Sequence, residues 1–244
     1  MTDMPFTLNK ILYANSTIAD GNMSMRYGDH AEVVAHRERF LEKSGGSLDD
    51  CVVMQLEHGD VVTRVGATDR GKGARTWGEG ITAEALMTNE PGVILFMLTA
   101  DCLPISYYDP VRRAIALAHL GWKPTDLHLA LKVVEEMHRE FGSDPADIRV
   151  TIGPGIRKES YIQKEVLQKE SHKWKYFLKD LPNGETSINL VGYNIAVLIA
   201  AGIDPKHITS SPVDTVKDLN YFSHYRATRT DEVHGRFATI LGLR

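Results

Sequence analysis

Cysteine is scarce in this chain: Cys51 and Cys102 are its only two among 244 residues. Two cysteines argue against a disulfide framework and favour an intracellular protein with reduced thiols. No apolar run approaches the roughly 20 residues that span a bilayer, and Met1 to Leu12 lacks the pattern of a secretory signal. The net charge of -4 gives no global nucleic-acid footprint. We therefore expect a cytoplasmic protein that binds neither nucleic acid nor membrane.

The sequence also lacks the features that divide a chain into parts. It has no low-complexity linker, internal repeat or long charge run, so we expect a single domain over residues 1–244. It contains neither Gly-x-Gly-x-x-Gly nor a phosphate loop of the Walker type. Its 43% apolar and 25% charged residues are typical of a soluble globular protein that buries a substantial core.

Strand and helix patterns are mixed along the chain. Helical spacing predicts helices over 31–43, from Pro124 and Thr125 to Gly142, and from Asn189 to Gly202. Strands are predicted around 93–98, 106–109, 113–119, 148–152 and 236–243, with 52–56 and 61–65 as a hairpin. The Gly-rich stretch 66–80 is predicted to be a mobile surface loop. Because the elements do not alternate strictly as βαβ, an α+β fold is favoured over α/β.

Three potential metal ligands stand at strand ends or turns. Cys102 follows the apolar run 93–98, His119 ends the next long strand, and His58 lies in the predicted hairpin turn. Thiolate sulfur and imidazole nitrogen are ligands of zinc, and a catalytic zinc site keeps one position open. The same residues have plainer interpretations, because a lone cysteine is often a small buried hydrophobe and a lone histidine a hydrogen-bonded core residue.

Motifs around these residues favour a functional site. Residues 99–104, 119–122 and 152–156 read TADCLP, HLGW and IGPGI, and with Gln55 to Gly59 they follow one family pattern in order and spacing. The C-terminal residues Phe222, Ser223, Arg226, Gly235 and Arg236 extend the match. Over nearly its whole length the chain resembles the laccase-domain family, also called multicopper polyphenol oxidases, whose bacterial members are similar to zinc-dependent purine nucleoside phosphorylases.

The resemblance implies a mixed-sheet domain packed between helices, an αββα-type sandwich similar to a toxin deamidase fold. It implies metal ligands at His58, Cys102 and His119, with zinc preferred to copper. It also implies phosphorolysis of adenosine, inosine or guanosine, with adenosine deamination and methylthioadenosine cleavage as further activities. Inorganic phosphate would be bound by Lys123, Arg226 or Arg236.

The chain departs from the family pattern at three places near the predicted site, one of which is Glu57, where an apolar residue is usual. Lys123-Pro124 replaces the usual Arg-Gly, which keeps a positive charge but loses the planar guanidinium fork. Gly155 replaces the usual cysteine of Gly-Pro-Cys-Ile. These departures affect the prediction of substrate and activity more than that of the metal site.

Neighbouring side chains have two interpretations each. Asp101 is predicted either as a catalytic residue that orients a ligand histidine or as the cap of the turn after the strand. Glu57 is a base near the metal or a solvated residue before the turn. Trp122 stacks on a purine or anchors the core.

Other functions use the same residues. A His₂Cys set also suits copper, but none of the ten histidines forms the His-x-His pairs of an oxygen-reducing laccase. Cys102 as nucleophile and His119 as base would give a metal-independent thiol hydrolase. An amidase and a non-catalytic paralogue remain open, as does the choice between monomer and homodimer.

Overall fold

The computed structural model describes residues 10–244, which form five α-helices and fourteen strands, besides short 3-10 helices. The helices are α1 His30–Ser44, α2 Trp122–Asp126, α3 Leu129–Phe141, α4 Leu190–Ala200 and α5 His224–Ala227. The strands are β1 Ile11–Asn15, β2 Cys51–Gln55, β3 Val62–Arg64, β4 Ile81–Thr82, β5 Ala85–Thr88, β6 Ile94–Thr99, β7 Leu103–Asp109, β8 Ala114–Leu120, β9 Arg149–Ile152, β10 Ile162–Gln163, β11 Leu178–Asp180, β12 Thr186–Ile188, β13 Ile208–Ser210 and β14 Phe237–Leu243.

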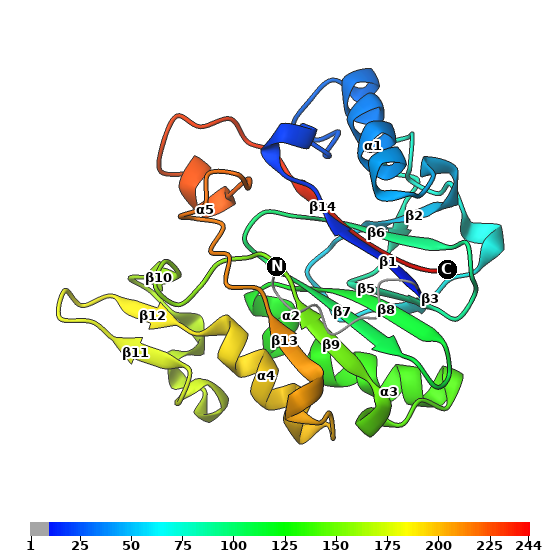
Figure 1. The fold of residues 1–244 in the computed structure, drawn as a ribbon. Helices are drawn as coiled ribbons and strands as arrows, with labels where there is room; N and C mark the ends of the chain where they lie inside the picture. Colours follow the sequence, from blue (N-terminus) through cyan, green and yellow to red (C-terminus); the bar gives the residue numbers. More distant parts are fainter. Residues whose placement is uncertain (1–9) are drawn as a thin grey trace.

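Two mixed sheets pack face to face between helices (Figure 1). The five-stranded sheet has the order β1-β14-β6-β2-β4, and α1 covers its outer face. The six-stranded sheet has the order β13-β9-β7-β8-β5-β3, and α3 and α4 cover its outer face. This arrangement confirms the predicted α+β class and the αββα sandwich.

Three layers of core follow from the alternation of side chains along each strand. In β8, Ile115 and Leu117 point into the core between the sheets, whereas Ala114, Ala116 and Ala118 face the helices. His119 continues the series of Ile115 and Leu117, so its side chain enters the space between the sheets at the end of the strand. Strand periodicity therefore sets the direction of one candidate ligand.

The predicted hairpin over 52–65 is wrong, although both of its strands exist. β2 belongs to the five-stranded sheet, where it pairs in parallel with β6, whereas β3 belongs to the six-stranded sheet and pairs in parallel with β5. The connection between them crosses from one sheet to the other instead of turning back. His58 lies in this crossing, with a left-handed φ of 60°.

The helix predicted to begin at Pro124 is split in two. α2 ends at Asp126, and His128 adopts a φ of 60°, which no helical residue has, before α3 begins. Gly142 ends α3 in the left-handed conformation, as the sequence predicts. α1 and α4 also lie where helices are predicted.

The remaining strands, β10, β12 and β11, form a small three-stranded sheet beside α4 (Figure 1). In the stretch between its first two strands, the buried ring of Trp174 stacks on Tyr193 of α4 at 4.1 Å between centroids, which anchors this extension. Within residues 10–244 no helix has both the length and the apolar character needed to cross a bilayer.

Candidate metal centre

His58, Cys102 and His119 converge in space although they come from three separate parts of the chain, two connections and the end of a strand. Their potential ligand atoms all lie within 4.8 Å of one another. The rings of the two histidines meet edge to face, with centroids 5.1 Å apart. Cys102 lies in the turn between β6 and β7, and His119 near the end of β8 opposite Pro104 of β7. The pairing of β7 with β8 thus brings the cysteine and the second histidine together.

The backbone of this site is held in uncommon conformations. His58 and Asp101, beside Cys102, have φ angles of 60° and 85°. A left-handed φ is unfavourable for residues other than glycine, and such strain persists where surrounding contacts fix it. The two turns that present His58 and Cys102 are therefore maintained by their environment rather than by local preference.

Glu84 is the buried carboxylate that orients His119. Glu84 is only 1% exposed. Its Oε2 lies 2.7 Å from His119 Nδ1, and its Oε1 accepts a hydrogen bond from the backbone N–H of Glu57. When Nδ1–H donates to the carboxylate, Nε2 carries the lone pair that binds a metal. The sequence signal for this residue is a single acid in the apolar run from Ile81 to Met87.

The site favours a cysteine thiolate. Burial alone raises the pKa of Cys102, but the charge of His119 and hydrogen bonds from both histidines outweigh it and lower the pKa to about 6. Burial lowers the pKa of His119, yet Cys102 and Glu84 outweigh that effect and raise it to about 9. Thiolate is the form of cysteine that binds metals and acts as a nucleophile, so both predicted chemistries have the required ionic form.

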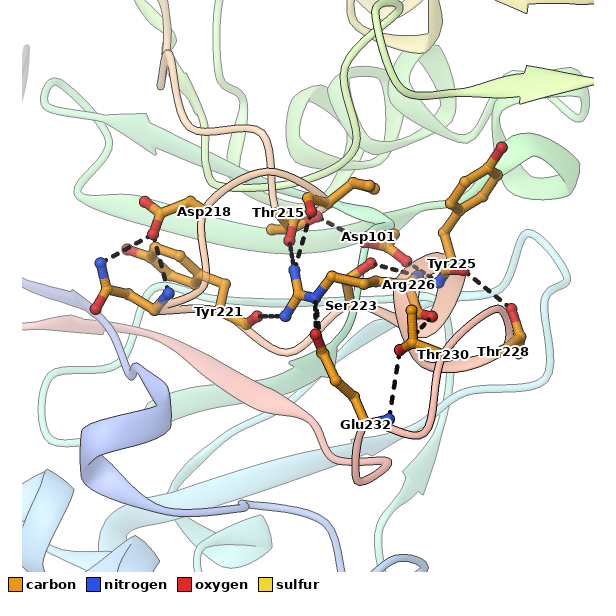
Figure 2. A network of polar contacts seen from close by, with 12 residues as sticks. Asp101, Thr215, Asp218, Tyr221, Ser223, Tyr225, Arg226, Thr228, Thr230 and Glu232 are labelled. Atoms are coloured by element: carbon orange, nitrogen blue, oxygen red, sulfur yellow. Dashed lines mark hydrogen bonds and ion pairs between the residues drawn. The ribbon is translucent and has the colours of Figure 1, made fainter.

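Asp101 connects the Cys102 turn to the C-terminal segment. Its carboxylate accepts hydrogen bonds from the Thr215 hydroxyl and from the backbone N–H of Tyr225, both at 2.6 Å (Figure 2). The carboxylate beside His119 is that of Glu84, which lies between β4 and β5. Glu84 rather than Asp101 therefore orients this histidine. Asp101 positions the turn through contacts that span more than 100 residues of sequence.

Arg226 belongs to the same C-terminal network. Its Nη1 donates to the carbonyls of Thr215 and Val216, its Nη2 to the carbonyl of Tyr221, and its Nε to the carboxylate of Glu232 (Figure 2). Its side chain is 10% exposed. The guanidinium predicted to bind phosphate therefore holds residues 215–232 in place with most of its donors.

Two glycines allow the Cys102 turn to pack closely. A Cβ on Gly121 would lie 2.9 Å from Cys102 Sγ, and one on Gly155 would lie 2.9 Å from the carbonyl oxygen of Asp101. Both distances are too short for an ordinary contact. Glycine at 155, a departure from the family pattern, thus accommodates the backbone of the turn in this chain.

A cavity of about 390 Å³ opens beside the metal-ligand cluster, and His58 is part of its wall. Its size falls in the range of small-molecule sites. Other wall residues come from the 24–27 segment, from β2 and from the 73–80 loop, and they include Tyr27 and Trp77; Arg236, directly before β14, also lines the cavity. Lys123 is exposed at the start of α2 and is not among the described residues that line this cavity.

Trp77 was not suggested by the sequence as a site residue. Trp77 is 54% exposed, belongs to the Gly-rich loop and is one of the residues that line the cavity. The same loop is only partly a surface feature, because Ala74 is 1% exposed and its carbonyl, with that of Gly73, accepts hydrogen bonds from the buried Arg37.

Replacing Glu84 by glutamine is expected to lower metal affinity by about 10–100-fold, the usual effect of losing a carboxylate behind a ligand histidine. Competition with a chelator measures this change. Glu57→Gln is the matched control, because the exposed Glu57 side chain is next to His58 while only its backbone N–H contacts Glu84. Equal metal affinity in Glu84→Gln and wild type would remove Glu84 from this role.

Comparison with known proteins gives a consistent result. The family model described as multi-copper polyphenol oxidoreductase laccase matches residues 6–244. A Bacillus subtilis protein named purine nucleoside phosphorylase YlmD is 28% identical over 97% of this chain and 90% of its own length. Its namesake from Geobacillus stearothermophilus is 31% identical over 91% of this chain and 83% of its own.

Two further proteins extend the comparison. A protein named adenosine deaminase RL5, from an unknown prokaryotic organism, is 30% identical over 78% of this chain and 75% of its own length. The crystal structure of the Bacillus licheniformis hypothetical protein YfiH superposes with a TM-score of 0.88 at 26% identity, covering 100% of this chain and 98% of that one.

Proposed function

This chain belongs to the multi-copper polyphenol oxidoreductase laccase family, and on that basis we propose that it is a zinc-dependent purine nucleoside phosphorylase. The observation that carries the proposal is the convergence of His58, Cys102 and His119 beside a cavity of small-molecule size. The names of its relatives in Bacillus subtilis and Geobacillus stearothermophilus support the reaction.

The donor set fits zinc. Two imidazoles and one thiolate with ligand atoms within 4.8 Å match a catalytic zinc site that leaves a fourth position open. Bound zinc supplies a Lewis acid that polarises a substrate oxygen or activates water. The described residues bring three or more such donors together only here, whereas an oxygen-reducing copper centre needs further clustered histidines. Zinc is therefore proposed rather than copper.

In the proposed reaction, inorganic phosphate attacks the anomeric carbon of the nucleoside ribose and the purine base leaves. Arg236 is available for phosphate because it lines the cavity together with His58. Lys123, at the start of the helix that follows His119, is the alternative proposed phosphate ligand, outside the described lining of this cavity. Glu84 holds His119 through Nδ1, and Asp101 holds the Cys102 turn, so both carboxylates act by positioning.

Trp77 is proposed as the aromatic wall for the base. Trp77→Ala is expected to raise the KM for the nucleoside by roughly tenfold with a smaller change in kcat, since stacking of a base on an aromatic ring contributes about 1–3 kcal/mol. Trp122→Ala is the matched control, because Trp122 is also partly exposed but starts α2 outside the cavity wall. A larger KM effect in Trp122→Ala would assign the stacking role to that residue instead.

The proposed function is tested by incubating the zinc-loaded protein with adenosine, inosine, guanosine or methylthioadenosine, with and without phosphate. Phosphate-dependent release of base and ribose-1-phosphate supports phosphorolysis. Inosine formed from adenosine without phosphate would instead indicate deamination, the activity in the name of one relative. If none of these products appears while Cys102 reacts rapidly with an alkylating agent, a thiol hydrolase or amidase becomes the better account.

A further inference from the structure

The cavity beside His58 carries an excess of positive charge. Three arginines, Arg26, Arg37 and Arg236, are among its wall residues. Among the described residues that line it, Glu57 is the one carboxylate. A concave wall with one sign of charge attracts a ligand of the opposite sign, so the charges of the wall point to an anion.

Arg26 and Arg236 lie against the same aromatic ring. The guanidinium carbon of Arg236 is 4.6 Å from the centroid of the Tyr27 ring, and that of Arg26 is 5.7 Å from it. Arg236 Nη2 also donates to the Tyr27 hydroxyl at 3.1 Å, and the ring of His234 stacks on Tyr27 at 5.7 Å. Both cations thus lie beside the Tyr27 ring.

No carboxylate neutralises this pair within residues 10–244. Arg26 makes no ion pair there, and the guanidinium of Arg236 donates only to the Gly235 carbonyl and to the Tyr27 hydroxyl, while its backbone N–H donates to Asn22 Oδ1. A guanidinium has five N–H donors, so both residues retain donors for a ligand. Cations that line one cavity without a counter-charge disfavour each other, and a bound anion reduces that unfavourable interaction.

Arg37 fixes the geometry around the pair. It is 1% exposed and donates through Nε to the Met23 carbonyl at 2.9 Å, and through Nη1 to the carbonyls of Gly73 and Ala74 at 3.0 and 2.8 Å. The first contact holds the segment that carries Arg26, and the other two hold the loop that carries Trp77. The buried cation adds its charge to the same cavity without a carboxylate partner in the described chain.

We propose that Arg26 and Arg236, spaced by Tyr27, form the subsite that binds a phosphate group in this cavity. Planar guanidinium forks match phosphate oxygens two at a time, which a single lysine does not. The subsite rests on the proposed function in one respect, because inorganic phosphate would be its ligand during phosphorolysis. The 5′-phosphate of a purine nucleotide has the same chemistry and is the alternative source.

The test is calorimetric titration of the purified zinc-loaded protein with inorganic phosphate, adenosine and adenosine 5′-monophosphate in separate experiments. Arg26→Gln is expected to weaken phosphate binding by roughly tenfold or more and to leave adenosine binding within about twofold. Arg236→Gln should act in the same direction. Arg139→Gln is the matched control, because Arg139 is an exposed residue of α3 that pairs with Glu136, and it should bind phosphate as wild type does.

The outcomes distinguish free phosphate from a nucleotide phosphate as the ligand, and Arg26 and Arg236 from Lys123 as the binding residues. Phosphate binding that is weakened in the Arg26 variant supports the subsite with free phosphate, whereas an effect confined to the monophosphate supports it with a nucleotide. The proposal is overturned if neither inorganic phosphate nor adenosine 5′-monophosphate binds the wild-type protein. It is also overturned if Arg26→Gln binds phosphate with the affinity of the wild type. Loss of binding in Lys123→Gln alone would place the anion at Lys123. If the arginine substitutions weaken phosphate binding but the wild-type protein shows no phosphorolysis, the proposed reaction is refuted and the phosphate subsite is not.

Discussion

Cys102→Ala is expected to lose its bound metal and at least about 100-fold of the proposed activity. The loss should exceed the 10–100-fold that removal of a supporting carboxylate causes, because the variant lacks the anionic ligand of the cluster. The cluster would retain only the imidazoles of His58 and His119. Elemental analysis and the phosphate-dependent release of adenine measure the two effects on the same sample.

Cys51→Ala is the matched control for this variant. Cys51 is fully buried in β2 on the face covered by α1, and burial raises its pKa, so it is an inert thiol. This control should keep its metal and its activity.

His58→Ala separates the metal account from the thiol hydrolase, since a Cys102–His119 pair does not need His58. Full activity in His58→Ala without metal would contradict the zinc account.

Arg37→Met is expected to destabilise the fold by about 3 kcal/mol or more, because three buried carbonyls lose their donor. At roughly 2–4 °C per kcal/mol for a chain of this size, the Tm should fall by roughly 6–12 °C. Methionine fills the hydrophobic part of the site, where the guanidinium lies 5.3 Å from the centroid of the Phe96 ring, so the main loss is polar.

Arg39→Met, two residues along the same helix, controls for the loss of a positive charge from α1. Arg39 is exposed, and exposed substitutions change stability by roughly 0.5 kcal/mol or less. Thermal unfolding of both variants followed by circular dichroism makes the comparison. Equal Tm values for the two would show that Arg37 does not hold the cavity walls together.

Local patterns predicted the elements better than their pairing. The apolar residues of β8 and the helical spacing of α1 and α4 are patterns among neighbouring residues, so these elements could be predicted. The partner of a strand depends on residues far away in sequence. His58 and Gly59 resemble a hairpin turn, but the strands on either side of them pair with β6 and β5 in different sheets.

The candidate site shows the same division. Motifs indicated the three clustered residues, while the contacts that support them are long-range and leave no local signal. Glu84 contacts His119 across 35 residues, and Asp101 reaches Thr215 across 114. Arg37 looks like any charged residue of an amphipathic helix until its buried position is known. Burial of a charge was therefore the property that sequence periodicity could not provide.

The most direct test of the account is the zinc K-edge X-ray absorption spectrum of the purified protein, compared with that of Cys102→Ala. We expect about one zinc per chain with one sulfur and two nitrogen ligands, and loss of the sulfur contribution or of the metal in the variant. Two results would contradict a metal centre built from His58, Cys102 and His119. One is a zinc ligand shell without sulfur in the wild type, and the other is a Cys102→Ala spectrum identical to that of the wild type.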